Sequence, residues 1–131
     1  MRRRIVFALL VAAVPSIAFA GPKEDAQAVF DTFLASFTAA NTGAIASLFA
    51  PEAMFWGTES QTLVTTPAEI RQYFSNAFGT PPRAGGAVNA SSLGTSALVR
   101  AENAVLVSGM WQSEGNPPRR LSLVVAKRGS L

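Results

Sequence analysis

Residues 65–74, Thr-Thr-Pro-Ala-Glu-Ile-Arg-Gln-Tyr-Phe, contain the clearest local structural signal in the chain. Thr66 can cap a helix with its hydroxyl group, Pro67 suits the first helical position, and Glu69 completes a capping box three residues after the cap. Apolar residues then recur along one side of the predicted helix: Ile70, Tyr73, Phe74, Ala77 and Phe78. The segment therefore predicts an amphipathic helix whose apolar face packs on the rest of the protein.

Two helices are expected before this segment. Between residues 22 and 41, apolar residues follow the i, i+3, i+4, i+7 spacing of one helical face: Ala26, Val29, Phe30, Phe33, Leu34 and Phe37. Pro22 suits the start of that helix, and Asn41-Thr42-Gly43 is typical of its end. A second, shorter helix is expected to follow Thr42 and to end before Pro51. Beyond it, Ala53–Thr58 has the composition of a strand.

Three strand-like runs follow the capped helix. They are Val88–Leu93, which can continue through Ala97–Arg100, then Ala104–Trp111, then Arg119–Arg128. Helices followed by strands are the segregated order of an α+β fold, and no linker divides residues 21–131, so a single domain is expected. The last two runs carry large apolar residues on both faces. Since helices can cover one face, we expect a second copy to cover the other, giving a homo-oligomer.

The first twenty residues, Met1–Ala20, have the organisation of a secretory signal peptide. Arg2, Arg3 and Arg4 form a basic start, Ile5–Val14 is apolar, and Pro15 precedes Ala18-Phe19-Ala20, an A-x-A cleavage site. The apolar run is well short of the roughly 20 residues that span a membrane. Cleavage after Ala20 is therefore predicted, leaving a secreted or periplasmic protein without a membrane anchor.

Charge and composition exclude several classes of function. The sequence has 11 Lys and Arg against 8 Asp and Glu, and the three arginines at positions 2–4 account for the whole excess. The predicted mature chain is thus neutral overall, and it lacks the excess of basic residues that is typical of binding to nucleic acid or to an anionic membrane. The absence of cysteine and histidine excludes thiolate nucleophiles, Ser-His-Asp catalysis and the usual zinc ligands. No metal and no cofactor is expected.

Three aromatic residues are candidates for a ligand-binding cavity. Trp56, Tyr73 and Trp111 each combine a large apolar ring with a polar atom, and such side chains are suited to a place where an apolar wall meets water. The helix-periodic phenylalanines are instead expected in the core, with Phe33 and Phe37 filling the inside of the sheet. We predict that the three residues converge on one opening of an apolar cavity.

Charged residues near these aromatics are weaker candidates, since solvated turn residues would give the same pattern. Glu59 follows the strand-like segment that contains Trp56, and it is the one carboxylate placed to act as a general base. Arg119 and Arg120 open the last strand, and an arginine that points inward can bind a ligand carboxylate with two hydrogen bonds. Of this pair Arg120 is predicted to bind ligand, with Glu59 or Arg120 at the rim of the opening.

Three segments carry a resemblance to a known superfamily. They are IASLFAPEAMFWGT (Ile45–Thr58), TTPAEIRQYF (Thr65–Phe74) and PPRRLSLVVAKRG (Pro117–Gly129). In this order, with a meander of strands at the end, they resemble the nuclear transport factor 2-like superfamily. The similarity is greatest to its SnoaL-like secreted bacterial proteins and to the association domain of calcium/calmodulin-dependent kinase. It covers about residues 25–131.

The resemblance implies a cone, in which N-terminal helices pack inside a strongly curved, mixed or antiparallel sheet and an apolar cavity opens at the wide end. It also implies dimers or larger rings. A closing strand should follow Arg128-Gly129, where this sequence stops at Leu131. We therefore expect a C-terminally truncated domain, in which that strand is missing from the sheet.

The resulting functional hypothesis is an exported domain that binds a small apolar ligand or mediates oligomerisation, with no evident catalytic set. The alternative is an enzyme of the SnoaL or ketosteroid isomerase type, performing acid–base chemistry on a polyketide-like or steroid-like substrate. Relatives that move protons usually present an Asp, His or Tyr in the cavity. This sequence has no histidine, and its two aspartates, Asp25 and Asp31, fall on the first predicted helix.

Overall fold

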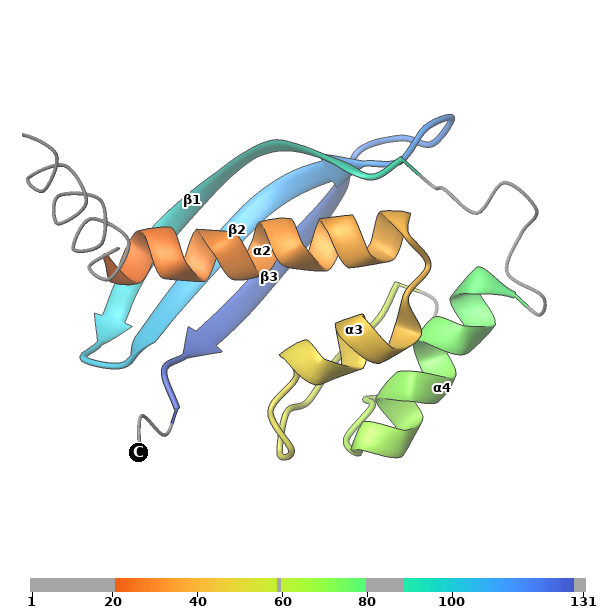
Figure 1. The fold of residues 1–131 in the computed structure, drawn as a ribbon, viewed down its shortest axis with the longest axis horizontal. Coiled ribbons are helices and arrows are strands. Elements are labelled where there is room, and N and C mark those ends of the chain that lie inside the picture. The colour runs from red at the N-terminus through yellow and green to blue at the C-terminus, as the bar shows by residue number, and fades with distance from the viewer. Residues whose placement is uncertain (1–20, 59, 80–88, 129–131) are drawn as a thin grey trace, which may run out of the picture.

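The chain folds into helices followed by strands, the α+β order that the sequence predicts (Figure 1). The computed structural model describes residues 21–58, 60–79 and 89–128. The elements are α2 (Pro22–Thr38), α3 (Thr42–Leu48), α4 (Pro67–Phe78), β1 (Ser91–Ala101), β2 (Ala104–Gln112) and β3 (Arg119–Ala126). Among the helices of the described ranges, none has the length and apolar character needed to cross a membrane.

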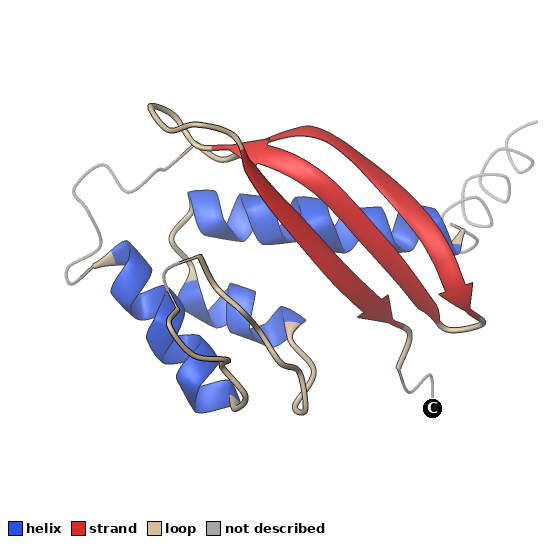
Figure 2. Cartoon of the chain, turned by 180° about the vertical axis from the view of Figure 1, so that it is seen from behind, coloured by secondary structure: helices blue, strands red, loops and turns tan. Residues whose placement is uncertain are grey.

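The three strands form an antiparallel sheet in the order β1-β2-β3. α2 crosses one face of this curved sheet, while α3 and α4 lie together beyond its β3 side (Figures 1 and 2). Within the described residues β3 pairs on one side only, with β2, so the sheet is open at β3. The structure thus has α2 packed inside a curved antiparallel sheet, as the resemblance implies, and the sheet has an open edge at β3.

Some expected boundaries are wrong. Ala53–Thr58 is not a strand: Phe55 and Val64 make a single antiparallel bridge, and the Ser60 N–H instead donates to the Gly57 carbonyl oxygen at 3.0 Å. The first helix ends at Thr38, and Asn41 instead caps α3 by accepting a hydrogen bond from the Ala44 N–H at 3.0 Å.

The strands differ less from expectation. The two runs predicted near residues 88–100 form one strand, β1, whose register shifts between Ser92 and Gly94, where Gly94 has a φ of +127°. Such a bulge takes up one extra residue and bends the strand. The expected start at Val88 lies outside the described residues, and β3 ends at Ala126, two residues before Arg128.

The core forms where α2 meets the inner face of the sheet. Phe30 and Val107 are fully buried, and Phe33, Val105 and Trp111 are nearly so. This face belongs to alternate residues of β2, as strand geometry requires. The pair predicted to fill the inside of the sheet does so in part: Phe33 is buried, whereas the half-buried Phe37 ring lies 5.2 Å from the Trp111 ring.

Gly109 interrupts the row of large inner residues where α2 comes close to the sheet. A Cβ atom at this position would lie 2.7 Å from the Gly94 carbonyl oxygen and 3.1 Å from the Phe30 ring. The backbone carbonyl cannot move aside cheaply. A side chain at position 109 would therefore clash with the β1 backbone and press on the Phe30 ring of α2.

The capping box predicted for α4 is confirmed. The Thr66 hydroxyl accepts the Glu69 N–H at 3.2 Å, and the Glu69 carboxylate accepts the N–H groups of Thr65 and Thr66 at 2.9 and 3.2 Å. These bonds satisfy N–H groups that a helix start leaves without partners. The Thr65 N–H is the main reason that the pKa of Glu69 lies below its ordinary value of 4.5.

This lowered pKa predicts a pH dependence of stability that Glu69 controls. The ionised carboxylate stabilises the start of α4 above the ordinary pKa of 4.5, and the benefit is lost as the pH falls through the lower pKa of the folded state. Glu69→Gln keeps the box geometry without the charge. Thermal unfolding should show the variant less stable than the wild type at pH 7 and equally stable at about pH 2. A difference that is the same at both pH values would contradict this.

Candidate functional site

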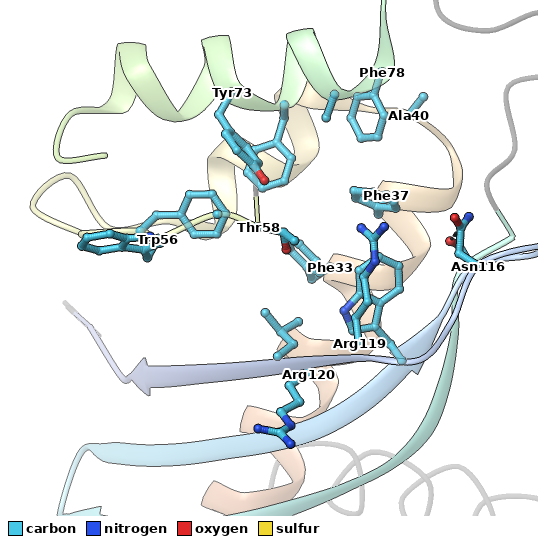
Figure 3. Close-up of a pocket in the computed structure, with 17 residues that line it drawn as sticks. Phe33, Phe37, Ala40, Trp56, Thr58, Tyr73, Phe78, Asn116, Arg119 and Arg120 are labelled. Atoms are coloured by element: carbon cyan, nitrogen blue, oxygen red, sulfur yellow. Dashed lines mark hydrogen bonds between the residues drawn. The ribbon is translucent and has the colours of Figure 1, made fainter. Parts of the chain in front are cut away.

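A cavity of about 370 Å³ lies between α4, the loop at residues 55–58 and the start of β3 (Figure 3). Aromatic residues make up about half of its lining. The aromatic lining residues are Phe33, Phe37, Phe55, Trp56, Tyr73, Phe74, Phe78 and Trp111. Polar atoms make up about half of the lining surface, and a volume of this size falls within the range of small-molecule sites.

Edge-to-face ring contacts fix the deep wall of the cavity. The Phe37 ring lies 5.1 Å from Phe78 of α4 and 5.2 Å from Trp111 of β2, with interplanar angles of 63° and 68°. Such offset and edge-to-face pairs are the favoured arrangement for aromatic side chains. The deep wall of the cavity is therefore formed jointly by α2, α4 and β2, and its shape depends on all three elements.

The three aromatic residues predicted to converge do line this one cavity, but at different depths. Trp111 is buried at its base, with 7% of its surface exposed, whereas Trp56 is 66% exposed at the mouth. Tyr73 is half-buried between them and extends from α4 toward the loop (Figure 3). Their contact with a ligand stays a prediction.

Tyr73 occupies its place because Gly57 leaves room for it. A Cβ atom at position 57 would lie 2.5 Å from the Tyr73 hydroxyl oxygen and closer still to the ring. Gly57 is buried, so the ring covers the loop backbone directly. Any side chain at position 57 would displace the tyrosine ring.

The two arginines at the start of β3 point to opposite faces of the sheet. Arg119 rises into the cavity, and its guanidinium carbon lies 5.9 Å from the centre of the Trp111 ring, within reach of a cation–π interaction. Arg120 borders the cavity, but its side chain extends away from it (Figure 3). Of the pair, Arg119 is the arginine whose side chain enters the cavity, while Arg120 lies at its border as predicted, and ligand binding by Arg120 stays a prediction.

Strand alternation could have identified Arg119 from the sequence. In β3, Leu121, Leu123 and Val125 are half-buried and face α2, and Arg119 shares their parity. Arg120 shares the parity of the exposed Ser122 and faces outward. The apolar Val124 obscures this alternation, because it lies on the outward face.

The turn between β2 and β3 forms the rim beside Arg119. The Asn116 amide nitrogen donates to the Ser113 hydroxyl at 3.0 Å and to the Glu114 carbonyl oxygen at 3.3 Å. Gln112 in turn donates to the Asn116 carbonyl at 2.8 Å. These hydrogen bonds fix the conformation of the turn, and so they help to fix the backbone position of Arg119 at the start of β3.

The candidate general base, Glu59, lies outside the described residues. Among the described residues that line the cavity, the charged side chains are Arg119 and Arg120, and none is acidic. No cluster of three or more His, Cys, Asp or Glu side chains suited to a metal ion occurs in the part of the chain that the structure describes. The described lining can bind an apolar molecule and an anionic group.

Sequence comparison alone gives no assignment. No protein-family model matches the chain, and no curated protein matches it significantly in sequence.

Solved structures show the fold. A Xanthomonas campestris protein, named as a candidate calcium/calmodulin dependent protein kinase II association domain, has a TM-score of 0.60 at 19% identity, over 88% of this chain and 82% of that one. A Pectobacterium atrosepticum protein of unknown function from the DUF3225 family has a TM-score of 0.64 at 15% identity, over 84% and 82%. A candidate polyketide cyclase from Sinorhizobium meliloti has a TM-score of 0.50 at 13% identity, over 77% and 84%. The chain thus shares the α+β fold of these solved structures, as the resemblance to the nuclear transport factor 2-like superfamily predicts, with a sheet that is open at β3 across the described residues.

Proposed function

We propose that this chain is an exported domain that binds a small, largely apolar molecule in the cavity between α4, the 55–58 loop and β3. The observation that carries the proposal is the aromatic cavity of about 370 Å³, which has an exposed tryptophan at its mouth. An apolar ligand would remove aromatic surface from water on both sides of the opening. Export is proposed from the sequence of residues 1–20, which has the organisation of a cleavable leader.

The Trp56→Ala variant tests ligand binding. Trp56 is 66% exposed, so its removal should leave the fold intact while taking away one wall of the mouth. We expect the affinity for the neutral fluorescent dye N-phenyl-1-naphthylamine to fall at least about tenfold, the loss that removing one ring contact predicts. Dye titration followed by fluorescence gives the affinity, and far-UV circular dichroism should be unchanged.

Met54→Ala is the matched control. Met54 is 70% exposed on the same loop, but it is not among the residues that line the cavity. Its variant should bind the dye as the wild type does. The binding proposal fails if the wild-type protein shows no saturable dye binding, or if Trp56→Ala and Met54→Ala behave alike.

The described residues support the enzymatic alternative less than they support binding. Of the groups that serve in general acid–base catalysis, the described lining of the cavity contains the Tyr73 phenol but neither a carboxylate nor an imidazole. We therefore propose binding as the function that the cavity supports best.

A second function, homo-oligomerisation, is favoured by the outer face of the sheet. Leu98, Leu106 and Val124 are direct neighbours across the three strands on the face away from α2. Leu98 is 52% exposed and Val124 is 73% exposed. A contiguous apolar row of this kind is typical of an interface. We propose that a second copy covers it, and a monodisperse monomer in light scattering at micromolar concentration would contradict this.

A further inference from the structure

Arg119 gives the cavity a positive charge within aromatic walls. Of the described residues that line the cavity, it is the charged one whose side chain rises into it, since Arg120 extends away (Figure 3). The Arg119 side chain is half-buried. A ligand that fills the cavity would therefore meet this guanidinium group.

No acidic side chain neutralises Arg119 within residues 21–58, 60–79 and 89–128. The ion pair found there joins Arg128 to Glu52, away from the cavity. Glu114 lies in the turn just before β3, but its carboxylate accepts a 2.6 Å hydrogen bond from the Asn89 side chain. The Trp111 ring, 5.9 Å from the guanidinium carbon, supplies an attractive face without a negative charge.

The polar group next to Arg119 is already engaged. The Asn116 amide donates to the Ser113 hydroxyl and to the Glu114 carbonyl oxygen. An arginine has five N–H donors in a planar fork, and a carboxylate matches two of them at once. The guanidinium is therefore the group in this part of the cavity best able to distinguish an anionic ligand from a neutral one.

We propose that the ligand of this cavity is an aromatic or alicyclic carboxylic acid, bound with its carboxylate on Arg119 and its ring against the aromatic walls. This inference rests on the proposed binding function and adds the chemical class of the ligand. The ring would contact the wall around Phe33 and Phe37, which lies beside the guanidinium group in Figure 3. The carboxylate of the ligand would accept two hydrogen bonds from the Arg119 guanidinium, a group that no acidic side chain of the described residues neutralises.

Two probes of the same shape test the proposal. Naphthalene-2-carboxylate and naphthalene-2-carboxamide differ in charge but hardly in size, so isothermal titration calorimetry of both isolates the contribution of the charge. We expect the wild-type protein to bind the carboxylate about 10- to 100-fold more tightly, the range for a charge-assisted hydrogen bond. Arg119→Gln should abolish this preference and leave carboxamide binding within about twofold of the wild type.

Arg120→Gln is the matched control, because it removes the same charge one residue away on the opposite face of the sheet. It should keep the preference for the carboxylate. Arg119→Lys should keep part of it, since lysine retains the charge but not the planar fork. Equal affinity of the two probes for the wild type, or equal losses in Arg119→Gln and Arg120→Gln, would overturn the assignment while dye binding could still stand. Absence of binding by either probe would also overturn it.

Discussion

Replacing Phe74 with alanine is expected to lower the free energy of unfolding by about 3–5 kcal/mol. Phe74 is 1% exposed and lies at the centre of the aromatic cluster that joins α2, α4 and the 55–58 loop. Its ring centroid lies within 6.4 Å of five other rings, those of Phe33, Phe49, Phe55, Tyr73 and Phe78. The rings around Phe74 come from several elements of the fold, so they cannot all move into the space that removal of the Phe74 ring leaves.

Chemical denaturation followed by circular dichroism measures this loss, and Phe37→Ala is the comparison. Phe37 is half-buried whereas Phe74 is 1% exposed, so removing the Phe37 ring returns less buried apolar surface to water and should cost less. Phe74→Leu should recover more than half of the lost stability, because it refills most of the volume. A loss below about 1 kcal/mol for Phe74→Ala would mean that the cluster collapses around the gap.

The Val124→Glu variant is expected to weaken self-association by at least about 100-fold, because each copy would place an unpaired carboxylate in the proposed interface. Val124 is 73% exposed on the outer face of β3, next to Leu106, so the monomer should fold as before. In a two-fold dimer the substitution occurs twice, once from each copy. Analytical ultracentrifugation across a dilution series gives the dissociation constant.

Met54→Glu supplies the control for this experiment. Met54 is 70% exposed, close to the value for Val124, but it lies on the loop before the cavity and not on the sheet. Equal weakening by both variants would indicate a general effect of charge and would remove the outer sheet face as the interface. No weakening by Val124→Glu would have the same consequence.

Local signals predicted the helices well because each is encoded within a few residues. The start of α4 depends on Thr66, Pro67 and Glu69, which contact one another, and the structure reproduces every bond of that motif. The order of helices and strands follows from periodicity in the same way. These features need no knowledge of distant contacts.

Features that depend on tertiary contacts were harder to predict. Ala53–Thr58 has the composition of a strand, yet strand formation needs a partner in register, and the described residues provide one bridge, from Phe55 to Val64. The place of Tyr73 depends on the absence of a side chain at Gly57, sixteen positions earlier in the sequence. Aromatic composition predicted which residues meet at the cavity, but the choice between Arg119 and Arg120 required the parity of β3.

The two tryptophans differ so much in exposure that the protein carries its own optical reporter. Trp56 is 66% exposed and Trp111 is 7% exposed, on different parts of one cavity. Iodide in the solvent should quench the long-wavelength emission of Trp56 and leave the shorter-wavelength emission of Trp111. A molecule entering the cavity would shield the Trp56 indole from solvent and contact the guanidinium group beside Trp111. Occupancy could then be followed by intrinsic fluorescence, without a label.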